Sequence, residues 1–221
     1  MAPRRRRLRI DGRRGINGRN GTVSEHTVVD DGLGDIDLAD GPWDYASAPS
    51  DAAFLDFGPL KVVRREGLKA RLEGDPILGK IGAVSVKVNE AEVQLQVITA
   101  PAGQAYWSVV RKALLAKLRE SAGSQQAIEG RFGPELIATV VGRRRDGLLG
   151  DSVMRLVGID GDRWLLRAVV TGPGATSDAT VARVDALLSQ CAVDRGSEAL
   201  AAGTVLPLKP PAGTKVEAPS A

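Results

Sequence analysis

The strongest constraint on the fold lies between residues 152 and 170. Two runs rich in strand-forming residues, 152–159 and 163–170, flank the short segment Asp160-Gly161-Asp162. An Asp-Gly pair between two such runs is a strong signal for a β-hairpin. Apolar residues occupy one whole face of the second run, and Leu165 and Val169 lie on its other face. We therefore expect two central strands, covered on one face and partly covered on the other.

Period-two alternation predicts a second hairpin. Val84, Val86 and Val88 alternate with Ser85 and Lys87, and residues 91–97 alternate in the same way after an Asn89-Glu90 turn. This pattern indicates two strands with one buried and one wet face. Shorter strands are expected at residues 54–57, 60–63, 67–73, 125–131, 136–141 and 191–193.

Two segments change to a helical period. The first carries its apolar residues at Trp107, Val110, Leu114 and Leu118 and is expected to end near Gly123. The second begins after the capping residue Ser177, and its apolar stripe is Val181, Val184, Leu187 and Leu188. Because strands joined by tight turns pair antiparallel, the predicted fold class is α+β, a largely antiparallel β-sheet packed with two amphipathic helices.

Composition divides the 221 residues into three parts. Residues 1–50 are predicted to be a disordered charged tail, with eight Arg and one Asp over 1–20 and seven acids without Lys or Arg over 21–50. Residues 51–196 form the single α+β domain, and residues 197–221 form a disordered Pro/Ala-rich tail. Trp43 and Tyr45 are expected to clip the first tail to the domain; the alternative is a partner contact.

The cysteine and histidine content bounds the compartment and the metal chemistry. One cysteine, Cys191, forms no internal disulfide, and one cysteine with one histidine is too few for a zinc site. Both facts fit a reducing cytoplasm. The basic start is followed by no apolar run, and no run has the length to span a membrane, so we expect a cytoplasmic protein without membrane contact.

No set of side chains suggests catalysis. His26 lies in the predicted tail, where nothing holds it against a nucleophile. Cys191 follows an apolar helix and is expected to be a small buried hydrophobe. Glu135 is the one carboxylate whose context calls for a check for a raised pKa, and a solvated carboxylate at a strand start is the favoured interpretation. We expect no catalytic residue, no metal and no cofactor.

Arginines are the candidates for anion binding. The candidate contacts to nucleic acid or another anion are Arg4, Arg5, Arg6, Arg7, Arg9, Arg13, Arg14, Arg143, Arg144 and Arg145. Arg167 stands inside the second central strand. On a partly covered sheet face its guanidinium lies over apolar neighbours, pairs with an acid, or binds an anion.

Five motifs in order resemble the actinobacterial domain of unknown function 3710. They are Gly41-Pro42-Trp43-Asp44, Val93-Gln94-Leu95-Gln96, Phe132-Gly133-Pro134-Glu135-Leu136, the run from Gly158 to Arg167, and Leu206-Pro207-Leu208. The resemblance spans roughly residues 41–210 and implies no catalytic residue, because the family carries no assigned activity. The order of strands and helices is also similar to the PsbP-like sandwich, a fold used mostly for docking.

The leading hypothesis is a non-enzymatic protein-interaction or scaffold module of the actinobacterial cytoplasm, with a protein partner. One alternative is an accessory nucleic-acid binder that uses the Arg-rich arm of residues 4–14. The other is an enzyme that works through carboxylates around Glu135.

Overall fold

The structure, a computed structural model, describes residues 41–65, 67–75, 80–120, 124–143 and 149–212. Residues 1–40 and 213–221, which belong to the predicted tails 1–50 and 197–221, lie outside these ranges. The elements are β1 (Trp43–Asp44), the 3-10 helix η1 (Tyr45–Ser47), β2 (Phe54–Asp56), β3 (Leu60–Val63), β4 (Ala70–Asp75), β5 (Lys80–Val88), β6 (Ala91–Thr99), α1 (Trp107–Glu120), β7 (Gln125–Gly130), β8 (Gly133–Arg143), β9 (Leu149–Gly161), β10 (Trp164–Thr171), α2 (Asp178–Ser189) and β11 (Ala192–Val193).

The strands form two sheets. The larger has seven strands in the order β4-β5-β6-β10-β9-β8-β7, and every neighbouring pair in it is antiparallel. The smaller has the order β1-β11-β3-β2, and its β1–β11 pair is parallel. The α+β fold with largely antiparallel sheets and two amphipathic helices is therefore confirmed.

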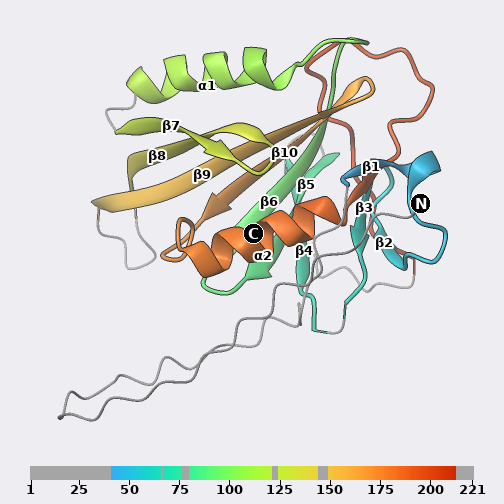
Figure 1. The fold of residues 1–221 in the computed structure, drawn as a ribbon, viewed down its shortest axis with the longest axis horizontal. Coiled ribbons are helices and arrows are strands. Elements are labelled where there is room, and N and C mark those ends of the chain that lie inside the picture. The colour runs from blue at the N-terminus through green and yellow to red at the C-terminus, as the bar shows by residue number, and fades with distance from the viewer. Residues whose placement is uncertain (1–40, 66, 76–79, 121–123, 144–148, 213–221) are drawn as a thin grey trace, which may run out of the picture.

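The two faces of the large sheet are covered differently. The main core joins one face of β5, β6 and β10 to residues of the small sheet, such as Leu60 and Val62, and to Val184 and Leu187 of α2. A second cluster lies on the other face, where α1 packs against β8, β9 and β10. Figure 1 shows α1 and α2 on opposite sides of the large sheet. The large sheet is thus the middle layer.

The turn of the central hairpin lies further along the chain than expected. Trp164 pairs with Gly161, so the loop consists of Asp162 and Arg163, and Arg163 adopts a positive φ of 61°. The turn predicted at Asp160-Gly161-Asp162 is wrong in its position, since Asp160 belongs to β9 and serves another element. In the other hairpin, Asn89 takes the positive φ (51°) that its turn requires.

The domain extends beyond the predicted boundary at residue 196. The backbone N–H of Leu206 donates to Val97 (2.9 Å), and that of Leu208 donates to Ile81 (2.8 Å). Both leucine side chains are buried in the main core. The prediction of a disordered tail is therefore wrong for residues 197–212. The prediction rested on the Pro and Ala content of the segment and overlooked two leucines, two positions apart, that bury enough apolar surface to order it.

The domain also begins before residue 51. The backbone N–H of Trp43 donates to Cys191 (3.1 Å), and Asp44 accepts a hydrogen bond from the Trp164 indole (2.5 Å). A Cβ at Gly41 would stand 2.6 Å from the Ser189 carbonyl oxygen, so glycine allows this close approach. The segment docks on the domain as a clip.

We expect Leu206→Ala to destabilise the protein by about 2–5 kcal/mol, because truncation leaves a cavity in the core. Val205→Ala is the matched control: the residue Val205 is 38% exposed, against 3% for Leu206, and its replacement costs about 0.5 kcal/mol or less. Urea denaturation of the full chain measures both. Equal effects would show that the segment contributes no core.

Candidate functional site

Helix α1 is anchored at its first turn. Asp160 of β9 accepts hydrogen bonds from the backbone N–H groups of Tyr106 and Trp107, both at 2.9 Å, and so caps the helix. The Trp107 ring lies on Gly158, where a Cβ would stand 2.1 Å from the ring, and its indole donates to the Pro134 carbonyl (2.7 Å). These contacts place α1 over β7, β8 and β9.

The rest of that sheet face carries polar side chains. Strand β6 presents Glu92, Gln94 and Gln96 at every second position, as its alternation predicted. The register places residues of β5, β10 and β4 beside them on the same face. We call this set the polar face; its members are Arg71, Glu73, Ser85, Lys87, Glu92, Gln94, Gln96 and Arg167.

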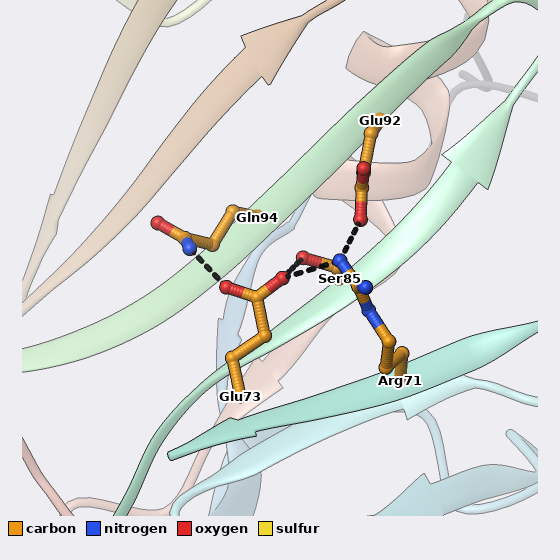
Figure 2. A network of polar contacts seen from close by, with 5 residues as sticks. All are labelled: Arg71, Glu73, Ser85, Glu92 and Gln94. Carbon is orange, nitrogen blue, oxygen red and sulfur yellow. Dashed lines mark hydrogen bonds and ion pairs between the residues drawn. The ribbon is translucent and has the colours of Figure 1, made fainter. Parts of the chain in front are cut away.

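Glu73 is the hub of the polar face (Figure 2). It accepts hydrogen bonds from the Ser85 hydroxyl (2.5 Å), the Gln94 amide and the Arg71 guanidinium (3.0 Å). Partial burial works to raise the pKa of Glu73, but the hydrogen bonds from Ser85 and Gln94 outweigh it. Together with the charge of Arg71 they lower the pKa of Glu73 below its ordinary value.

Arg71 ties the hub to a second carboxylate. Its guanidinium also reaches Glu92 at 2.7 Å, so it bridges Glu73 and Glu92. The Arg71 side chain is 70% exposed, and Glu92 is about half exposed. This ion pair is solvated and contributes little stability by itself, but it holds charges of both signs in fixed positions at the surface.

Arg167 lies at the border between the polar face and the area under α1. Its neighbours on the same face of β10 are Leu165, which is fully buried in the α1 cluster, and Val169, which is partly buried there. Its guanidinium donates to the Gln96 amide oxygen, and its Nε is buried without a hydrogen-bond partner. Burial lowers the pKa of Arg167 below its ordinary value. Among the described residues no carboxylate is paired with it.

Another arginine, Arg155, faces the opposite side of the sheet and is paired. Its Nε and one Nη contact both oxygens of Glu135 (2.6 and 2.9 Å), and the same Nη contacts Asp185 of α2 at 2.7 Å. Burial works to lower the pKa of Arg155, but its hydrogen bonds to Glu135 and Asp185 outweigh burial and raise the pKa. This network joins β8 and β9 to α2.

Glu135 is therefore not the solvated carboxylate that its context favoured. The side chains of Glu135 and Arg155 are each 1% exposed. A Cβ at Gly130 would stand 1.8 Å from Glu135, so only glycine leaves room for the carboxylate there. The prediction missed the pairing because Glu135 and Arg155 lie on different strands and meet only through the sheet register.

Most of the predicted binding residues fall outside the described ranges. Arg4, Arg5, Arg6, Arg7, Arg9, Arg13, Arg14, Arg144 and Arg145 lie outside the described residues, and Arg143 is the last residue of β8. Trp43 is part of the clip. Tyr45 is 46% exposed, lies edge-on to Phe54 with ring centroids 6.2 Å apart, and has the Lys61 ammonium 4.9 Å from its ring centre. The roles of these residues in binding stay predictions.

Sequence reasoning missed most of the polar face. The alternation of β6 identified a wet surface, but it could not indicate that Glu73 reaches Gln94. That contact depends on the pairing of β4 with β5, which is irregular between Glu73 and Gly74. Cys191 was predicted correctly: it is fully buried, and burial raises the pKa of its thiol to about 12.

The described residues contain no cluster of three or more His, Cys, Asp or Glu side chains that could hold a metal ion. In the same ranges, neither helix combines the length and the apolar character that crossing a membrane requires.

A family model described as "Protein of unknown function (DUF3710)" matches residues 41–217. The chain belongs to the DUF3710 family. No curated protein matches this DUF3710 chain. A crystal structure of a protein from Bacteroides thetaiotaomicron VPI-5482 is similar to it, with 12% identity and a TM-score of 0.38 over 66% of this chain and 49% of that one. This chain thus spans about half the length of that protein. The likeness to the PsbP-like sandwich stays a prediction.

We expect Arg155→Met to destabilise the protein by about 3–5 kcal/mol, because it leaves two carboxylates without their buried partner. Arg71→Met is the matched control, since Arg71 also bridges two carboxylates but is exposed, and its loss costs about 0–1 kcal/mol. Chemical denaturation at neutral pH compares the two variants. Similar losses would contradict a structural role specific to the buried network.

The lowered pKa of Glu73 gives a pH dependence with a defined sign. Its ionised form stabilises the folded state above its ordinary pKa of 4.5, and this contribution is lost as the pH falls through the lower folded value. The stability difference between the wild type and Glu73→Gln should therefore shrink below about pH 4.5. Urea denaturation between pH 7 and pH 3 measures it, with Glu129→Gln as the control for removing one exposed carboxylate. A constant difference would contradict the assignment.

Proposed function

We propose that this DUF3710 protein is a non-enzymatic protein-interaction module of the actinobacterial cytoplasm, which docks a protein partner on the polar face. The observation that carries the proposal is the half-covered sheet. Helix α1 covers β7, β8 and β9 (Figure 1), while β4, β5, β6 and part of β10 present ordered polar side chains that, except for the buried Ser85, remain partly or fully exposed. The single, buried cysteine agrees with a reducing compartment.

The mixture of charges favours a protein partner over nucleic acid. Arg71, Lys87 and Arg167 alternate with Glu73 and Glu92 on this surface. A nucleic-acid backbone carries closely spaced phosphates, and it would place some of them over the fixed carboxylates. A protein surface can instead offer both signs at matching positions. Nucleic-acid binding through residues 4–14 stays an alternative prediction, because these residues lie outside the described ranges.

The carboxylates of the described residues support a binding role better than a catalytic one. Both oxygens of Glu135 are engaged by Arg155 in the interior. Glu73 has a lowered pKa and accepts hydrogen bonds from several neighbouring side chains. A general acid or base needs a pKa near the working pH and access to substrate, and neither carboxylate has both.

Photocross-linking in the native host tests the proposal. A photoreactive residue at Lys87, an exposed position on the polar face, should capture a defined protein, whereas the same residue at Ala179 on α2 should not. Gln94→Lys should abolish the adduct at position 87, because it replaces the neutral amide that contacts Glu73 with a longer, positively charged side chain.

A melting temperature near that of the wild type is the control for Gln94→Lys. An adduct that forms equally at positions 87 and 179, or that persists in Gln94→Lys, would contradict docking on this face.

A further inference from the structure

Two arginines of the large sheet differ in a way that points to a ligand. Arg155 leaves solvent with two carboxylates, Glu135 and Asp185, at hydrogen-bond distance. Arg167 is also largely withdrawn from solvent, but its partner is a neutral amide, that of Gln96. Burial lowers the pKa of Arg167, and no neighbouring negative charge offsets this effect. Arg155 is thus balanced by two carboxylates, whereas Arg167 has no carboxylate partner among the described residues.

An unbalanced cation of this kind works against the stability of the fold. Taking a guanidinium out of water is unfavourable unless a paired charge and hydrogen bonds replace the lost hydration. The buried Nε of Arg167 lacks a hydrogen-bond partner, and one amide oxygen serves the rest of the contact. A ligand with a negative charge at the exposed part of the Arg167 side chain would supply the compensating charge that the fold omits.

We propose that Arg167 anchors a carboxylate of the docked partner, so that the polar face takes a peptide segment that contains an acidic residue; this inference rests on the proposed function. A guanidinium binds a carboxylate through two parallel hydrogen bonds, which gives both energy and orientation. Arg167 also stands beside Val169 at the apolar border of the face. The segment that fits has an acidic residue next to an apolar one.

The fixed acids of the face define the rest of the ligand. Strands β10 and β4 are separated by β6 and β5, so three strand spacings of about 4.8 Å place Glu73 roughly 14 Å from Arg167. An extended peptide covers that distance in about four residues. A basic residue four positions from the acid would therefore lie near Glu73 and Glu92. A phosphate, with its higher charge, would meet more repulsion from these acids.

The test titrates the full-length chain with the peptide acetyl-Ser-Val-Glu-Val-Ser-Ser-Lys-Ser-amide and follows the Arg167 Nε–H signal by NMR. We expect this signal to shift, and we expect Arg167→Met to raise the Kd at least about tenfold. A peptide with Gln in place of Glu should lose affinity to a similar extent. The Glu-containing peptide has no net charge, which limits its attraction to the basic N-terminal residues.

Arg65→Met is the matched control. Arg65 likewise donates to a glutamine, Gln190 (2.5 Å), and has a buried Nε without a partner, but it lies off the polar face. Its replacement should leave the Kd within about twofold. Arg167→Met should also melt no lower than the wild type, because it removes an uncompensated cation. If Arg167 instead stabilised the fold, Arg167→Met would melt at a lower temperature than the wild type.

Four results would overturn the inference: no shift of the Arg167 signal, equal binding of the Glu and Gln peptides, unchanged binding by Arg167→Met, or melting of Arg167→Met well below Arg65→Met. Binding of inorganic phosphate at Arg167 without binding of the peptide would also overturn it, in favour of a phosphate ligand. If the adduct at position 87 forms equally in Arg167→Met, docking on the polar face stands and only the carboxylate anchor fails. If no adduct forms, the docking proposal itself fails.

Discussion

The arrangement depends on one constraint: α1 is fixed at its first turn and covers only part of a seven-stranded sheet. Asp160 caps the helix, and the Trp107 ring occupies the space that Gly158 leaves open. Both anchoring residues of the sheet belong to β9, so the helix is held over that strand, its neighbour β8 and the edge strand β7. The strands at the other end of the sheet must therefore satisfy their outward side chains with polar contacts or with solvent.

The residues packed against each face of the large sheet determine whether an arginine on that face is paired with a carboxylate. Arg155 points to the side covered by α2, where β8 provides Glu135 and the helix provides Asp185. Arg167 points to the α1 side, where its neighbours along the strand are Leu165 and Val169. The same side chain thus becomes a structural tie on one face and an incompletely satisfied cation on the other. Such an imbalance is expected where binding rather than stability has shaped a position.

Local pattern predicted the elements but not the contacts that join them. The alternation of Val84, Val86 and Val88 gave the strand and its wet face, and the helical spacing after Trp107 gave α1. The capping of α1 by Asp160 joins residues more than fifty positions apart, and no local signal carries it. The burial of Leu206 was missed for another reason: composition describes a whole segment, whereas burial concerns single side chains.

A polar sheet face that is already ordered has an advantage as a binding surface. Side chains that hold one another, as Arg71, Glu73 and Gln94 do, lose less conformational freedom when a partner arrives. Val169 adds apolar surface at the border of the polar face. Arginine is among the residues that contribute most to the binding energy of protein interfaces. Charge, order and an apolar edge thus converge on the strands that α1 leaves uncovered, and this convergence favours recognition over catalysis on this face of the sheet.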